Sequence, residues 1–176
     1  DLLEACLEAA SRRVDTICNR RFYLDASASA RTYACTGKLL FVDDIGSTTG
    51  LVVKEDTADD GTFATTLVLG TDYVLEPAKD GRPYTTLRRL NQDWPFSYTG
   101  RDAIQVTAKW GWPAVPTAVE LATRIIATNL YKRKDSPAPG GVYGSVETGF
   151  FKASTYDADV YMLLDSVRKR SEERRV

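Results

Sequence analysis

One stretch of the sequence decides the fold: VTAKWGWPAVPTAVELATRIIATNLYKRKDSP, which spans residues 106–137. Its first residues belong to a β-like run, and the segment 111–116 must end that run. Each of its two prolines removes a backbone donor and forbids the preceding residue a helical conformation. Thr117, with Glu120 three positions later, has the pattern of a capping box at a helix start. The stretch therefore predicts a strand that passes directly into a central helix.

The predicted helix carries a broad apolar stripe. One face of it is formed by Val119, Ala122, Ile126 and Leu130. Leu121 and Ile125 widen this face, which indicates burial against the helix's own domain and against something further, such as a neighbouring copy. Core or strand packing is the ordinary explanation of the aromatic residues just before the helix, but such residues also suit an interface. The candidate residues for a subunit interface or for the core are Trp110, Trp112, Ile126, Leu130 and Tyr131.

Upstream of this stretch, the sequence predicts a helix followed by a β-rich insert. Residues 1–21 place apolar side chains at three- and four-residue steps, with acidic residues early and basic residues late, as the helix dipole favours. From 31 to 110 the periodicity changes to short β-like runs separated by turn residues. The expected strands are 31–35, 38–42, 51–55, 65–69, 72–75, 84–87 and 103–110. Their simplest pairing is an antiparallel meander.

Downstream, the central helix runs into Pro137, and a connection over 136–149 is rich in glycine and proline. Asp157 then caps a last helix whose apolar stripe ends at Val167. Beyond it we expect an extended C-terminal arm, 168–176, that contains the basic residues Arg168, Lys169, Arg170, Arg174 and Arg175 and the acidic residues Glu172 and Glu173. The length suits one domain, so we expect residues 1–176 to form a single domain that contains the insert and the arm.

The composition excludes several classes of protein. The 176 residues carry a formal net charge of -1, three cysteines and no histidine. Without histidine there is no His-based triad, and no lysine or carboxylate stands at a spacing that would activate a nucleophile, so we expect no enzyme. Cys6 and Cys18 fall on the apolar face of the first helix, which indicates small buried side chains. No apolar run approaches the ~20 residues that span a bilayer, so we expect no membrane contact.

Two loop patterns resemble ligand sites only in part. Asp56, Asp59 and Asp60 suggest a calcium loop, but its spacing would place ligands at Ala58 and Leu67, so a hairpin turn explains them better. The glycine-containing loops lack the Lys-Ser/Thr pair of a phosphate-binding loop. We therefore expect no metal and no cofactor.

The order of motifs resembles the head-tail connector (adaptor) proteins of tailed bacteriophages. The similarity is carried by LLEACLEAASRRVDTICNRRFY (2–23), LLFVDDI (39–45), GTDYVLEP (70–77), DGRPYTTLRRLN (80–91), the stretch 106–137 and FFKASTYDADVYMLLDSVRKR (150–170). Its most specific part is the turn WGWPAVP followed by a helix that ends in LYKRKDSP. These segments cover most of the chain.

This resemblance implies an α+β fold, in which the N-terminal, central and C-terminal helices form a helical connector core with an antiparallel β-rich insert. It implies a structural protein of the virion, assembled in the host cytoplasm and placed at the head-tail interface. Copies would form a ring, expected to be a dodecamer, under the portal protein. The ring would continue the DNA channel without sequence-specific binding and would attach a stopper or tail protein below. The portal-binding residues would be those of the arm: Arg168, Lys169, Arg170, Arg174 and Arg175.

A second function, from another class, stays open. The basic C-terminal tail suits a small nucleic-acid-binding module as well. A net charge of -1 provides no global basic field, so any contact with DNA has to be local. The affinity for DNA and its salt dependence distinguish the two hypotheses. A DNA-binding protein loses affinity steeply as the salt concentration rises, whereas a channel that lets DNA slide binds it poorly at any salt concentration.

Overall fold

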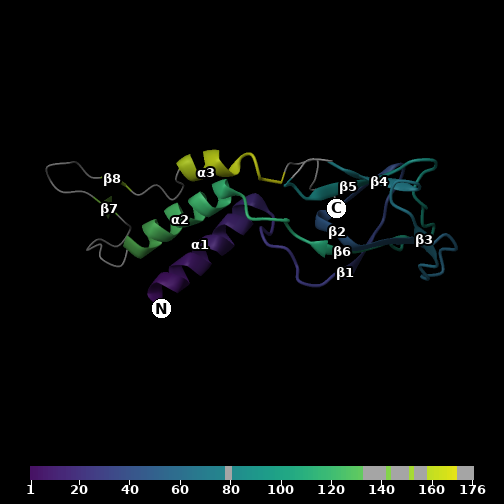
Figure 1. Cartoon of the computed structure of the whole chain (residues 1–176), viewed down its shortest axis with the longest axis horizontal. Coiled ribbons are helices and arrows are strands. Elements are labelled where there is room, and N and C mark those ends of the chain that lie inside the picture. The colour runs from purple at the N-terminus through teal and green to yellow at the C-terminus, as the bar shows by residue number, and fades with distance from the viewer. Residues whose placement is uncertain (78–80, 133–141, 144–150, 153–157, 170–176) are drawn as a thin grey trace. The chain divides into compact units, whose positions relative to one another are not determined.

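The computed structural model describes residues 1–77, 81–132, 142–143, 151–152 and 158–169 (Figure 1). The chain divides into two compact units. The helical unit comprises Asp1–Arg20 and Val115–Arg168, and the β unit comprises Arg21–Ala114 and the chain from Lys169. The expected β-rich insert therefore lies within the β unit, between the two segments that build the helical unit. The protein has an α+β fold, as the sequence predicts.

Three helices build the helical unit: α1 (Leu2–Cys18), α2 (Thr117–Lys132) and α3 (Ala158–Leu164). α1 packs against α2, and α2 packs against α3. α1 ends at Cys18 and not at residue 21, because Asn19 adopts the left-handed conformation (φ 51°) and its N–H donates to the carbonyls of Asp15 and Thr16. Within the described part of the chain, no helix is long and apolar enough to cross a bilayer.

The start of α2 differs by one residue from the predicted capping box. Thr117 is already helical, and the N–H of Glu120 donates to the carbonyl of Pro116 at 3.1 Å. Thr117 therefore lies one position too late to act as the cap. The predicted stripe is buried at Val119, Ala122 and Ile126 and half-buried at Leu130.

Cys18 is expected to resist alkylation in the folded protein. Burial raises the pKa of its thiol to about 11, so that at pH 8 it remains protonated and is a poor nucleophile. Iodoacetamide should label Cys18 only as the protein unfolds, while the half-buried Cys6 serves as the internal reference. Mass spectrometry of the cysteine peptides measures both rates. Labelling of Cys18 at the rate of Cys6 without denaturant would contradict the burial of this thiol.

The connection expected over 136–149 contains a short strand. β7 (Val142–Tyr143) pairs with β8 (Phe151–Lys152) in an antiparallel ladder. The remaining residues of this connection, and the predicted cap Asp157, lie outside the described residues.

Six strands form the sheet of the β unit: β1 (Ser29–Tyr33), β2 (Leu39–Glu55), β3 (Thr65–Leu67), β4 (Tyr73–Glu76), β5 (Tyr84–Arg89) and β6 (Ile104–Trp110). The order is β1-β6-β2-β5-β4, β3 pairs with β2, and every pairing is antiparallel. The antiparallel prediction is confirmed. The meander is wrong, because β6 returns from the end of the insert to lie between β1 and β2.

β2 is a single strand of 17 residues where the sequence predicts two strands, 38–42 and 51–55. Its first part pairs with β5, where Leu40 faces Leu87. From Ile45 onward it pairs with β6, with register shifts between Ile45 and Val52, and Val53 faces Val106. Its last residues also pair with β3. β2 thus joins the two halves of the sheet.

The core of the β unit is built by buried residues of these strands and by Trp94, which follows β5. It consists of Tyr33, Leu40, Val42, Ile45, Val53, Leu67, Tyr73, Leu75, Leu87, Trp94, Ile104, Val106, Ala108 and Trp110.

One ion pair is buried with these core residues. Arg89 donates from Nη2 to both carboxylate oxygens of Glu55, at 2.9 and 3.1 Å. The Arg89 guanidinium also lies over the ring of Trp94, at 5.3 Å from the centroid. The three side chains bind β2, β5 and the following segment together.

The Trp-Gly-Trp motif joins three segments of the β unit. The N–H of Gly111 donates to the carbonyl of Asp44 at 2.7 Å, and the N–H of Asp25 donates to the carbonyl of Trp110 at 2.8 Å. Gly111 has φ +112°, and a Cβ placed on it would lie 1.8 Å from the carbonyl oxygen of Tyr23. Only glycine permits this close approach of two backbones.

Candidate functional site

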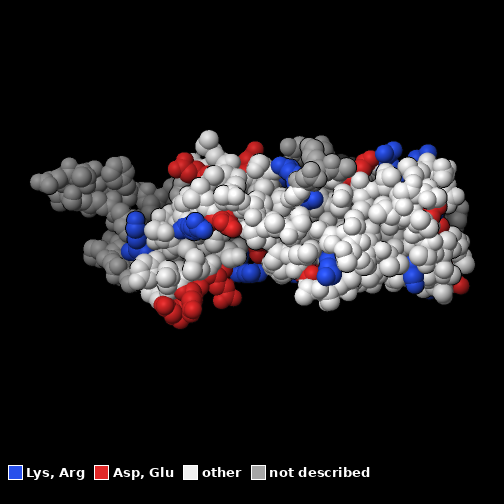
Figure 2. All heavy atoms as spheres, viewed as in Figure 1, with Lys and Arg blue, Asp and Glu red and all other residues white. Residues whose placement is uncertain are grey.

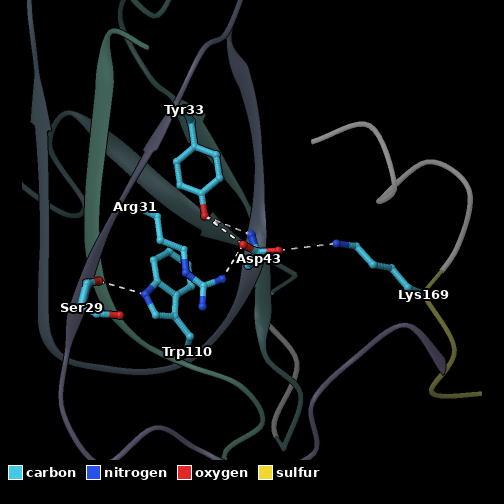
Figure 3. Close-up of polar contacts among 6 residues, drawn as sticks. All are labelled: Ser29, Arg31, Tyr33, Asp43, Trp110 and Lys169. Atoms are coloured by element: carbon cyan, nitrogen blue, oxygen red, sulfur yellow. Dashed lines mark hydrogen bonds and ion pairs between the residues drawn. The ribbon is translucent and has the colours of Figure 1, made fainter. Parts of the chain in front are cut away.

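A polar cluster in the β unit surrounds Asp43 on β2 (Figure 3). Arg31 of β1 donates from Nη1 to Asp43 Oδ2. The hydroxyl of Tyr33 donates to the same oxygen at 3.4 Å, and the backbone N–H of Asp43 donates back to that hydroxyl at 3.4 Å. Two strands that are not neighbours in the sheet are therefore linked through one carboxylate.

Trp110 fixes the position of Arg31. The guanidinium of Arg31 lies 4.4 Å from the centroid of the Trp110 ring, which is a cation–π contact. The ring itself is held by its indole N–H, which donates to the carbonyl of Ser29 at 2.9 Å. Arg31 is thus constrained on its flat face by Trp110 and at its edge by Asp43.

Tyr33 remains a hydrogen-bond donor over the physiological pH range. Burial and the neighbouring Asp43 carboxylate raise the pKa of its hydroxyl to about 12. A tyrosine with this pKa does not act as a general base near neutral pH. The polar cluster around Asp43 is therefore suited to fixing the positions of its charged side chains, with no proton transfer by Tyr33.

Lys169 also contacts Asp43, from the start of the expected C-terminal arm. Its ammonium lies 3.9 Å from Asp43 Oδ1, and its side chain is only 11% exposed. Arg168, the residue before it, is exposed. Of the other predicted portal-binding residues, Arg170, Arg174 and Arg175 lie outside the described residues.

The candidate interface or core residues are divided between the two units. Trp110 and Trp112 belong to the β unit and are buried, and Trp112 packs at 5.2 Å from the ring of Phe22. Ile126, Leu130 and Tyr131 lie on α2 of the helical unit, with Ile126 buried and the other two half-buried. Two of the five predicted residues therefore belong to the β unit and three to the helical unit.

A second ordered feature of the β unit is a loop with two exposed aromatic rings. Phe96 and Tyr98 pack edge to face at 5.3 Å, and Tyr98 is 89% exposed. Asp59 holds this loop: its carboxylate accepts from the hydroxyls of Ser97 and Thr99 and from the N–H groups of Tyr98 and Thr99, at 2.7 to 3.0 Å. Asp56 instead accepts from the N–H of Gly61 at 2.7 Å. The carboxylates of both aspartates therefore accept hydrogen bonds from backbone N–H groups beside the turn.

The loop is expected to stay attached to Asp59 at acidic pH. The hydrogen bonds from Ser97 and Thr99 lower the pKa of Asp59 below the ordinary value of 3.8. A lowered folded-state pKa means that this stabilisation is present above the ordinary value and is lost only as the pH falls through the lowered one. The amide NMR signals of Tyr98 and Thr99, followed from pH 7 to pH 2, should therefore change below pH 3.8, and Asp59→Asn should remove the transition. A midpoint above 3.8 would contradict this assignment.

The fold can also be compared with proteins of known sequence and structure. No family model and no curated protein matches the chain. Solved structures do match its α+β arrangement. One is a chain in the neck of an empty gene transfer agent (GTA) particle, computed with C6 symmetry, with a TM-score of 0.54 and 18% sequence identity over 96% of this chain and 78% of that chain.

Two further matches come from the native GTA particle. A chain of its neck, computed with C12 symmetry, aligns with a TM-score of 0.54 and 16% identity over 96% of this chain and 82% of that chain. A chain of the native virion aligns with a TM-score of 0.53 and 17% identity over 96% of this chain and 77% of that chain. At this level of identity the comparisons show a shared fold.

Proposed function

We propose that this chain is a structural head-to-tail adaptor of a tailed-phage-like virion. Copies form a ring under the portal protein, continue the DNA channel and provide the attachment site for a stopper or tail protein. The observation that carries the proposal is the match of 96% of the chain to neck chains of a particle computed with C6 and C12 symmetry. The sequence resemblance to phage head-tail connectors points to the same role.

The ring is proposed to contain twelve copies and to form on the portal. A heterologous contact that repeats around an axis closes into such a ring. A ring of the isolated chain would need a large, dry interface between copies, so before it meets the portal the chain is expected to be a monomer or a weak oligomer. Mass measurement of the chain alone and mixed with its portal protein tests this. A stable dodecamer without the portal would contradict the templated assembly, and no association with the portal would contradict the function.

The arm is proposed to supply portal contacts through its arginines. Replacing Arg170, Arg174 and Arg175 by glutamine leaves Lys169 in place and removes three positive charges. Charge-assisted contacts of ~1.5–3 kcal/mol each on an acidic partner would then be lost. The expected result is a large loss of portal co-sedimentation without a change in melting temperature.

A matched control removes the same charge elsewhere. Arg82, Arg101 and Arg124 are exposed, and their replacement by glutamine should leave portal binding unchanged. On the face seen in Figure 2, positive and negative side chains are interspersed, which is unlike the continuous basic surface of a DNA-binding module. Unchanged portal binding by the arm variant, together with a large loss of duplex DNA binding, would favour the nucleic-acid-binding alternative.

A further inference from the structure

The environment of Lys169 is unusual for a lysine at the start of a charged tail. Lysine side chains normally extend into solvent, yet this one is 11% exposed and its ammonium faces Asp43 Oδ1 at 3.9 Å. The sequence predicts that Lys169 belongs to an extended arm beyond the apolar stripe that ends at Val167. The structure places it against the β unit, where Figure 3 shows it approaching Asp43 from the side opposite Arg31.

Other residues already hold the Asp43 carboxylate in one orientation. Its Oδ2 is occupied by Arg31 and Tyr33, and Arg31 is itself held by the Trp110 ring. Oδ1 is left to face Lys169. Because the carboxylate is already oriented, the contact with Lys169 loses less side-chain entropy than a pair of two free surface side chains.

From this geometry we infer that Asp43 and Lys169 form an intramolecular latch that holds the beginning of the C-terminal arm on the β unit of the free chain. An acidic surface on a partner competes with Asp43 for the same ammonium, so the latch opens when the arm engages that surface. The existence of the latch rests on the contacts around Asp43 alone. Its role in partner binding rests on the proposed function.

The latch is weak enough to be reversible. The Asp43 side chain is 41% exposed, so solvent screens part of the attraction. Opening should therefore be disfavoured only by about fivefold, which corresponds to ~1 kcal/mol. Such a contact holds Lys169 on Asp43 without preventing its transfer to a partner.

A lysine-specific protease measures the latch in the free chain. Cleavage after Lys169 requires its side chain to leave Asp43 and enter the protease, whereas the neighbouring arginines are not cut. Asp43→Asn should accelerate release of the C-terminal fragment 170–176 by about fivefold. Glu76→Gln is the matched control, because it removes an exposed carboxylate that pairs with Arg88 at 2.7 Å on the same unit. It should leave the cleavage rate after Lys169 unchanged.

The salt dependence of the cleavage rate provides a second test. For the wild-type chain, the rate of cleavage after Lys169, divided by the protease's rate on a small lysine amide, should rise toward that of Asp43→Asn as salt screens the ion pair. Equal rates for wild type and Asp43→Asn, with no effect of salt, would overturn the latch. Equal acceleration by Asp43→Asn and Glu76→Gln would also overturn it, since that result indicates general loosening of the β unit.

Binding to the portal protein tests the role of the latch. If the partner competes with Asp43, Asp43→Asn should bind the portal up to about fivefold more tightly, because the competing contact no longer has to open. Weaker or unchanged binding by this variant would overturn the competition. If neither protein binds the portal while the protease result holds, the adaptor function fails and the latch remains.

Discussion

Replacing Gly111 with alanine is expected to unfold the β unit or to destabilise it severely. Gly111 has φ +112°, and a Cβ would lie 1.8 Å from the carbonyl oxygen of Tyr23. The backbone conformation alone costs about 1–3 kcal/mol for a residue with a side chain. Displacing a backbone adds about 1–3 kcal/mol of overpacking, so the expected loss is about 2–6 kcal/mol. Urea denaturation followed by tryptophan fluorescence measures it.

Gly70 supplies the matched control. It also has a positive φ, +84°, but a Cβ on it would meet nothing within 4 Å. Gly70→Ala should therefore show only the conformational cost of about 1–3 kcal/mol. If Gly111→Ala is no more destabilising than Gly70→Ala, the close approach to Tyr23 is not a determinant of stability.

Removing one partner of the Glu55–Arg89 pair is expected to have an effect of similar size. Their side chains are 3% and 5% exposed, so Arg89→Met leaves a carboxylate buried without its cation. Such a change typically costs about 3–5 kcal/mol. Adding Glu55→Gln to Arg89→Met should recover much of the loss, because no buried charge then remains unpaired. Arg88→Met, next in sequence but exposed, should cost at most about 1 kcal/mol.

The pH dependence of these variants provides a second criterion. Burial raises the pKa of Glu55, and the Arg89 guanidinium opposes this effect. Without Arg89 the folded-state pKa should rise further above the unfolded value. A raised pKa gives stability that is fully present below the unfolded value and is lost as the pH rises through the folded one. The deficit of Arg89→Met should therefore be smaller at pH 5 than at pH 8, and a larger deficit at pH 5 would contradict the burial of an unpaired carboxylate.

The sequence predicts the helices well because their signals are local. The stripe around Val119, Ala122 and Ile126 repeats at helical spacing, and the prolines at 113 and 116 mark where the strand must end. The strands are less well predicted. Gly46, Gly50 and the polar residues between them interrupt the pattern of β2, although long-range pairing with β5 and β6 keeps it one strand. No local pattern reveals that β6 lies between β1 and β2.

The candidate site shows the same division between local and long-range information. The basic composition of the arm is visible in the sequence, and Trp110 stands out as an aromatic residue beside a turn. The sequence does not predict Asp43 as a site residue, because its partners Arg31 and Lys169 are distant along the chain and meet only in the folded β unit. An aspartate inside a mostly apolar strand, in the segment LLFVDDI, is the signal that would have identified it.

The contact between Gly111 and Tyr23 has a consequence for how this architecture diversifies. It brings the entry and the exit of the long segment Arg21–Ala114 together, so that the segment begins and ends at nearly the same point. The entropic cost of closing a loop rises only weakly with its length, by about 0.6 kcal/mol for each doubling. A segment whose ends adjoin can therefore be lengthened, shortened or replaced at little cost in loop closure. The helices on either side keep their own packing. Of the glycines that the structure describes in this segment, the one at the exit, Gly111, would place a Cβ closest to another atom and so has the least room for a side chain.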